Sequence, residues 1–184
     1  MPIDTKSPVG TKYKSLNGEN ENTARPIPAV LNAMSMKNTD IKTSGAPDIS
    51  LSGLKIWISG RQFEDSTDYW DANWLVITAR CSSYFSEVII QGPIIHLSEL
   101  ELWMSELLKL NETIRGEAVL NCMEPELSAS IRLDKNGSGT LTVFITPDNM
   151  NEQHRFTFTI DQSWLPSLIR ELQTVLTKYP IKGI

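Results

Sequence analysis

The sequence has few of the residues that cross-link small secreted proteins or bind metal ions. Its 184 residues include two cysteines, Cys81 and Cys122, and two histidines, His96 and His154. Two cysteines cannot form a disulfide framework, and the two histidines have no neighbouring motif with the spacing of metal ligands. We therefore expect a protein that uses no metal ion and no cofactor.

Long apolar runs and an excess of positive charge are also missing. No apolar run approaches the roughly 18 residues that a membrane-spanning helix needs. Residues 1–6 lack the basic start and apolar centre of a secretory signal. Lysine and arginine number 17 against 22 aspartates and glutamates, which gives a formal charge of -5 and argues against a nucleic-acid binder that depends on phosphate contacts. We expect a cytoplasmic protein that binds neither nucleic acid nor membranes.

The first 50 residues lack tryptophan and phenylalanine, whereas all five tryptophans and all five phenylalanines of the chain come later. Aromatic side chains supply the largest single burials in a core. The composition therefore predicts a flexible N-terminal leader over residues 1–50 and a single domain over residues 51–184. Residues 27–36 are apolar enough to dock or to form a short helix. The leader carries a net charge of +1, which leaves -6 on the domain.

Strand patterns dominate the domain. Residues 127–133 alternate apolar and polar side chains, which is typical of a strand with one wet face. Three strands are expected before the first helix, with Gly92 and Pro93 ending the third, and three or four after it. The expected strands cover residues 54–58, 74–80, 84–90, 117–123, 127–133, 140–145 and 155–160. Their connections are too short for crossovers, which makes the pairing antiparallel.

Two amphipathic helices complete the expected fold. Ser98 and Glu101 have the spacing of a capping box at the start of the first helix. Its apolar face is predicted to contain Leu100, Trp103, Met104, Leu107 and Leu108. The second helix follows Asp161 or Ser163 and ends at Pro180. Its apolar stripe is predicted to contain Leu165, Leu168, Ile169, Leu172, Leu176 and Tyr179. We expect an α+β domain in which a mostly antiparallel sheet of about six strands packs with the two helices.

One polar concentration stands out between the first two expected strands. Residues 64–71, here named the connector, place four carboxylates and two aromatic side chains close together. They are Glu64, Asp65, Asp68, Tyr69, Trp70 and Asp71. A calcium loop would need a central glycine, which this segment lacks. A solvated loop is one interpretation, and an acidic, aromatic surface that binds a basic partner is the other, since exposed aromatic rings beside charges are typical of interfaces.

No pattern in the sequence indicates an enzyme. The chain has no Gly-x-Ser-x-Gly motif, and the glycines at residues 137 and 139 join two strands rather than a strand and a helix. Two rival functions stay open. An enzyme could use Glu64, Asp68 or Cys81. A small ligand-binding or regulatory module could enclose a pocket lined by Trp57, Trp70 or Trp74.

Four segments resemble the WapI family of bacterial immunity proteins. They are Asp68–Leu75 (DYWDANWL), Leu97–Leu107 (LSELELWMSEL), Glu124–Leu127 (EPEL) and Phe156–Ser163 (FTFTIDQS). The resemblance implies a non-enzymatic protein that binds and neutralises the C-terminal domain of a cognate bacterial toxin in the cytoplasm of the producing cell. Occlusion of the toxin's active site is the expected mechanism.

The charge of the domain agrees with that role. A net charge of -6 favours a basic toxin domain, because complementary charge speeds the encounter and disfavours wrong partners. The family contributes no transferable site residues, so the six connector residues are a prediction from charge and aromaticity. The identity of the toxin and the oligomeric state stay open.

Overall fold

The computed structural model describes residues 45–183, all of which belong to one compact unit. The strands are β1 (Ile49–Leu51), β2 (Leu54–Arg61), β3 (Trp74–Ser82), β4 (Glu87–His96), β5 (Gly116–Asn121), β6 (Leu127–Leu133), β7 (Ser138–Ile145) and β8 (Arg155–Asp161). The helices are α1 (Leu97–Thr113) and α2 (Leu165–Lys178), with short 3-10 turns η1 (Asp71–Asn73) and η2 (Gln162–Trp164). The predicted leader, including residues 27–36, lies outside the described residues except for residues 45–50, of which Ile49 and Ser50 are in β1.

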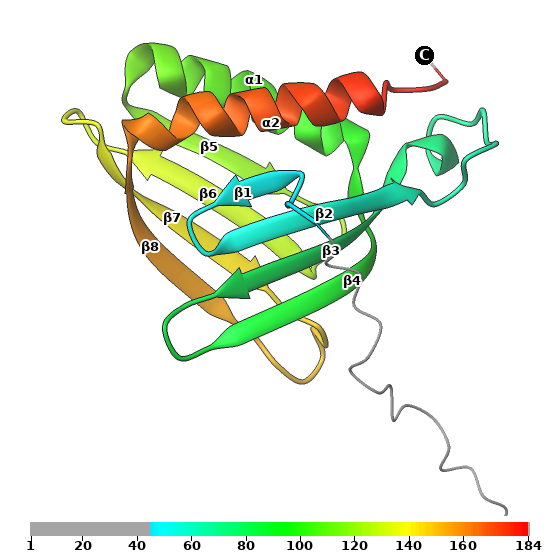
Figure 1. Cartoon of the computed structure of the whole chain (residues 1–184), viewed down its shortest axis with the longest axis horizontal. Coiled ribbons are helices and arrows are strands. Elements are labelled where there is room, and N and C mark those ends of the chain that lie inside the picture. The colour runs from blue at the N-terminus through cyan, green and yellow to red at the C-terminus, as the bar shows by residue number, and fades with distance from the viewer. Residues whose placement is uncertain (1–44, 184) are drawn as a thin grey trace, which may run out of the picture. The chain divides into compact units, whose positions relative to one another are not determined.

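The eight strands form two antiparallel sheets and not one sheet of about six strands (Figure 1). One sheet has the order β1-β2-β3-β4, and the other has the order β5-β6-β7-β8. The predicted α+β class is confirmed, but the predicted single sheet is wrong. A strand as short as β1 leaves no periodic pattern, and alternation along a strand does not say which sheet the strand joins.

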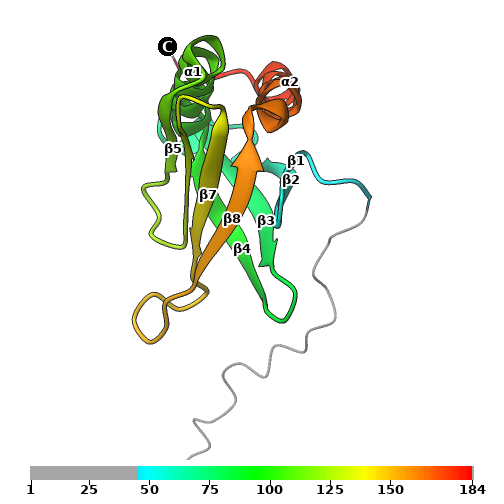
Figure 2. The same ribbon diagram turned by 90° about the vertical axis from the view of Figure 1, so that its left-hand side faces the viewer.

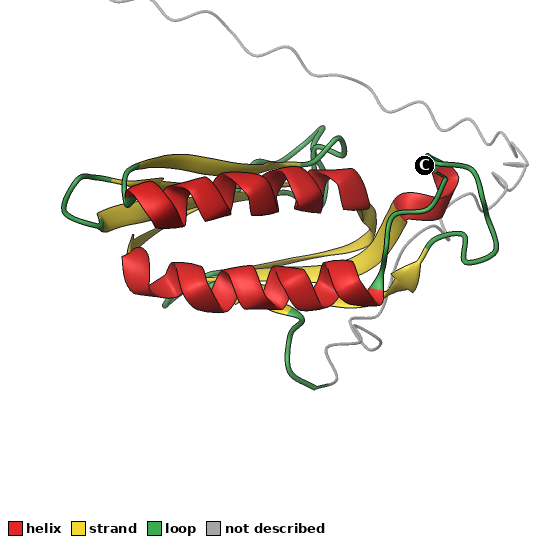
Figure 3. Ribbon diagram, turned by 90° about the horizontal axis from the view of Figure 1, so that it is seen from above, coloured by secondary structure: helices red, strands yellow, loops and turns green. Residues whose placement is uncertain are grey.

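The two halves of the domain repeat the same order of four strands followed by one helix. The two helices lie side by side across the sheets (Figure 3). Each helix packs on the first strand of the other half, α1 on β5 and α2 on β1. Glu106 of α1 accepts a hydrogen bond from the backbone N–H of Val119 at 2.7 Å, and Glu171 of α2 accepts one from Ser50 at 2.8 Å. The helices thus cover the edges of β1 and β5 that would otherwise lack partners.

The core lies between the sheets and under the helices. In β6, Leu127, Ala129, Ile131 and Leu133 are buried, which confirms the alternation seen in the sequence. The buried face of α1 contains Leu100, Trp103, Met104 and Leu107 as predicted, whereas Leu108 is exposed. The buried face of α2 contains Leu165, Leu168, Ile169, Leu172 and Val175, and Leu176 and Tyr179 are partly buried against the core. No helix of the described residues is long and apolar enough to cross a membrane.

Two local expectations at the start of α1 are wrong. The N-cap residue is His96 rather than Ser98, and the side chain of Glu99 rather than Glu101 accepts the N-cap backbone N–H, at 2.9 Å. The third expected strand also continues through Gly92 and Pro93 to His96. Proline lacks an N–H donor, but β4 is an edge strand, where that donor has no neighbouring strand to bond. The extension brings His96 opposite Trp74 in β3.

Candidate functional site

The connector joins β2 to η1 at one end of the first sheet, beside the segment that follows α2 (Figure 1). Its four carboxylate residues, Glu64, Asp65, Asp68 and Asp71, are all exposed. None of them forms an ion pair with another residue of the described range. The connector therefore presents four carboxylates to solvent that form no ion pair within residues 45–183, although the ammonium of Lys182 lies at the backbone carbonyl of Glu64.

Asp68 also shapes the connector. Its Oδ1 atom accepts hydrogen bonds from the backbone N–H groups of Trp70 at 2.8 Å and Asp71 at 3.1 Å. Its carbonyl accepts a third from the N–H of Ala72 at 2.9 Å. An aspartate side chain that bonds the backbone two and three residues on fixes a turn. Asp68 thus sets the direction of Trp70 and Asp71.

An aromatic cluster lies behind the carboxylates. The ring centroids of Tyr69, Trp70 and Trp74 lie 5.4, 5.5 and 5.3 Å from the ring of His96. His96 is fully buried, whereas Trp70 is 57% exposed. The cluster thus has a buried base and an exposed outer ring. Phe63, just before the connector, is also exposed and adds apolar surface beside it.

Sequence reasoning missed the position of His96. Its Nδ1 atom lies 2.7 Å from Ser98 Oγ, and its Nε2 atom is buried without a hydrogen-bond partner in the described residues. The sequence showed no metal-ligand spacing around His96 and did not relate His96 to the connector. The sequence alone could not place His96 beside the aromatic residues, because His96 lies opposite Trp74 only through the register of β3 and β4.

A buried arginine supports the connector from the inside. Arg61, at the end of β2, is buried and donates to the carbonyl of Ala72 at 2.5 Å and to the carbonyl of Pro180. Its guanidinium carbon lies 6.0 Å from the ring centroid of Tyr179. On the outer side, Lys182 Nζ donates to the backbone carbonyl of Glu64 at 2.6 Å. The connector is therefore anchored at both of its ends to the segment that follows α2.

The two cysteines do not suit thiol chemistry. Cys81 is fully buried, and that burial raises the pKa of its thiol to about 12. Burial, followed by the neighbouring Glu99 carboxyl, raises the pKa of Cys122 still further. A nucleophilic cysteine needs an accessible thiolate near neutral pH. Neither cysteine meets that requirement, and no group of three or more metal-ligating side chains gathers within residues 45–183.

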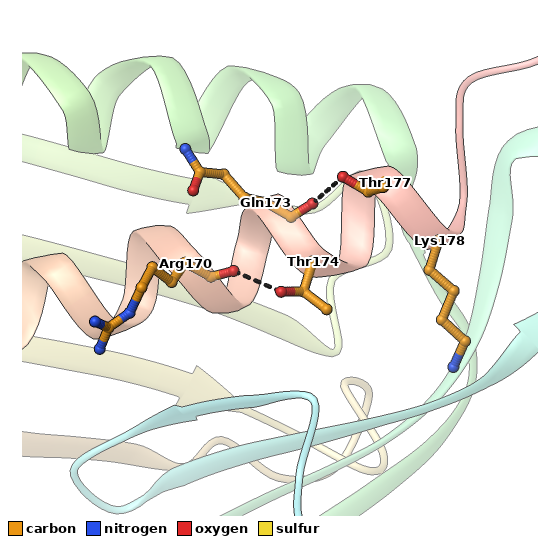
Figure 4. Close-up of a pocket in the computed structure, with 5 residues that line it drawn as sticks. All are labelled: Arg170, Gln173, Thr174, Thr177 and Lys178. Atoms are coloured by element: carbon orange, nitrogen blue, oxygen red, sulfur yellow. Dashed lines mark hydrogen bonds between the residues drawn. The ribbon is translucent and has the colours of Figure 1, made fainter.

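An open groove of about 540 Å³ runs along α2 (Figure 4). Its lining consists of Arg170, Gln173, Thr174, Thr177 and Lys178. The two threonine hydroxyls donate back to helix carbonyls, at 2.9 Å for Thr174 and 2.7 Å for Thr177. All five side chains come from one helix and do not converge on a ligand. No tryptophan is among them, so this groove is not the Trp-lined pocket considered from the sequence.

A second exposed aromatic surface lies at the opposite end of β3. Tyr84 and Phe85 occupy the β3–β4 turn, and each is 91% exposed. Their rings stack edge to face at 4.5 Å, and the turn is closed by a 2.8 Å hydrogen bond from the N–H of Ser83 to the carbonyl of Ser86. Figures 1 and 2 place this turn at the end of the molecule away from the helices. The sequence predicted a strand for these residues and missed the turn.

Comparisons with known proteins give one informative match. A family model described as the immunity protein WapI-like family matches residues 47–180, which confirms the resemblance read from the sequence. No curated protein matches the chain. The crystal structure of WHY1 from Arabidopsis thaliana is 12% identical, covering 70% of this chain and 78% of that chain with a TM-score of 0.40. The crystal structure of WHY3 from the same plant is 10% identical, with coverages of 68% and 81% and a TM-score of 0.37.

Proposed function

Because the chain belongs to the immunity protein WapI-like family, we propose that it binds a cognate toxin domain and neutralises it in the cytoplasm of the producing bacterium. The protein carries out no reaction. It covers the active site of the toxin domain and keeps substrate out. The connector, with Glu64, Asp65, Asp68, Tyr69, Trp70 and Asp71, makes the contact.

The observation that carries this proposal is that carboxylates without an ion pair in the described residues and exposed aromatic surface occur together on one connector. Four exposed carboxylates have no ion-pair partner in the described residues, and Trp70, which is 57% exposed, lies among them. Tryptophan and tyrosine are the residues in which binding energy most often concentrates, and unpaired rim charges speed association with a partner of opposite sign. The partner that this surface fits is a basic protein domain.

The hydrogen bonds that anchor the connector also favour binding. A loop that is ordered before it meets its partner loses less conformational entropy on association. Arg61 and Lys182 hold the backbone of the connector at its two ends, and Asp68 holds its centre. A pre-ordered acidic surface can match one basic cleft closely.

The function is tested by titrating the activity of the toxin domain encoded next to this gene with the purified full-length chain. We expect activity to fall linearly and to reach zero at one equivalent, because occlusion is stoichiometric. The two proteins should also co-purify. A toxin domain that keeps full activity and forms no complex at micromolar concentration would overturn the proposal.

A further inference from the structure

Asn73 is a fully buried polar residue whose side chain has every hydrogen-bonding position occupied. Its Oδ1 atom accepts from Arg61 at 3.1 Å and from the backbone N–H of Lys182 at 3.0 Å. Its Nδ2 atom donates to the carbonyl of Tyr69 at 2.7 Å and to the carbonyl of Lys182 at 2.9 Å. An amide has two donors and two acceptor sites, so none is left over.

The four bonds of Asn73 join two nearby segments, within 12 residues of it, to a third segment that lies 109 residues away in the sequence. Arg61 belongs to β2, Tyr69 to the connector, and Lys182 to the segment after α2. The side chain of Asn73 meets both the N–H and the C=O of Lys182, as a neighbouring strand would. This pairing needs a donor and an acceptor side by side on a short side chain, which the asparagine amide provides.

The segment of residues 180–183 fits closely against the connector. Pro180 accepts a hydrogen bond from Arg61, and Lys182 donates one to Glu64. Gly183 has a φ of 75°, and a Cβ atom placed on it would lie 2.8 Å from the Cα and N atoms of Tyr69. Both the backbone conformation and the space at this position therefore favour glycine.

We infer that Asn73 is a positioning residue of the partner-binding surface, which it builds by tying residues 180–183 to the back of the connector. The predicted effect of Asn73 on binding rests on the proposed function, in which the connector is the surface that meets the toxin domain. Asn73 itself is buried and touches no partner. Its effect on binding passes through Tyr69, whose carbonyl it holds, and through the neighbouring Trp70.

The first test measures the connector in the free protein. In Asn73→Ala, we expect the amide of Ala72, which bonds the carbonyl of Asp68, to exchange its hydrogen at least about tenfold faster than in the unchanged chain. The amides of β6, in the other sheet, should keep their exchange rates. Gly183→Val is the second variant, because it removes no hydrogen-bonding side chain and displaces residues 180–183 by steric conflict. Gly183→Val should also speed hydrogen exchange at the amide of Ala72 and leave the amides of β6 unchanged.

The second test measures binding against stability. Both variants should raise the Kd for the toxin domain about tenfold, through lost pre-organisation of the connector. Val143→Ala, in the buried core of β7, lowers the melting temperature without touching the connector and should leave the Kd unchanged. This control separates positioning from general destabilisation.

Unchanged exchange of the Ala72 amide in both variants would overturn the inference. So would a loosened connector that binds the toxin domain with the original Kd. If the unchanged protein binds no toxin domain at all, the proposed function fails. The exchange rates, measured without a partner, still decide whether Asn73 positions the connector.

Discussion

The connector carboxylates differ at the scale of single residues. Asp68 Oδ1 accepts two backbone hydrogen bonds, so replacing Asp68 would disturb the turn as well as remove a charge. Glu64, Asp65 and Asp71 are exposed and have no such bonds to the backbone in the described residues. Charge can therefore be changed at these three positions with little effect on the fold. A substitution at Asp68 would mix the two effects.

We expect Trp70→Ala to weaken toxin binding by about 2 kcal/mol, roughly a 30-fold rise in Kd, because exposed tryptophans at the centre of an interface carry much of its energy. The melting temperature should change little, since Trp70 is more than half exposed. Titration calorimetry and thermal melts measure the two quantities. Phe85→Ala, at the far end of β3, is the matched control and should leave the Kd unchanged. If Phe85→Ala weakens binding and Trp70→Ala does not, the β3–β4 turn is the interface.

The two thiols should be inert in the folded protein. Burial raises the pKa of Cys81 to about 12, and the pKa of Cys122 is raised as well, so neither forms a thiolate at pH 8. We expect no iodoacetamide adduct on native protein at pH 8 and two adducts after unfolding in urea, as counted by mass spectrometry. A rapid adduct on the native protein would show that one thiol is accessible and would reopen a catalytic role for Cys81.

The residues of the candidate surface are a prediction from the sequence, which did not show how they are held. Four carboxylates and two aromatic residues within eight positions form a local pattern, and such a pattern is visible without a structure. The roles of His96 and Asn73 depend on strand register and on a segment more than 100 residues away. Single-sequence periodicity contains no information about contacts of that range.

At the scale of elements, one glutamate on each helix fastens that helix to the opposite half of the domain. Glu106 bonds the edge of β5, and Glu171 bonds the edge of β1. These are hydrogen bonds from backbone N–H groups to carboxylates, which are stronger than neutral ones. They also satisfy donors on strands that have no further strand beside them.

We expect Glu171→Ala to lower the free energy of unfolding by about 1.5–3 kcal/mol, the usual contribution of a hydrogen bond to a charged group. Urea denaturation measures the change. Glu117→Ala, which removes an exposed carboxylate from β5, is the control and should alter stability by less than about 0.5 kcal/mol. Equal stability of the two variants would show that the bond from Ser50 does not hold β1 in place.

The elements themselves were largely predictable, whereas their assembly was not. Alternation placed β6 and β8 within a residue of their observed bounds, and the 3.6-residue period placed the buried faces of both helices. β1 escaped prediction because it has only three residues, and the division into two sheets escaped it because alternation along a strand does not say which sheet the strand joins. The N-cap at His96 escaped it because histidine is an uncommon cap and Ser98 offered a commoner one two residues later.

At the scale of the whole molecule, the protein is acidic, and the connector concentrates four of its negative charges at one end of the first sheet. A net charge of -5 attracts any basic partner, but only a local concentration can orient it. The central claim is that this concentration, and not the overall charge, guides the toxin domain to the connector. Two variants of equal charge separate these contributions.

The most direct measurement is the association rate constant at low salt for two double variants. Glu64→Lys with Asp65→Lys reverses charge on the connector. Glu112→Lys with Glu117→Lys makes the same change near the C-terminal end of α1, a helix about 25 Å long whose N-terminal end follows His96. We expect the connector variant to associate at least about tenfold more slowly than the unchanged chain and to lose most of its salt dependence, with only a small decrease for the second variant. Equal rate constants for the two variants would contradict the account.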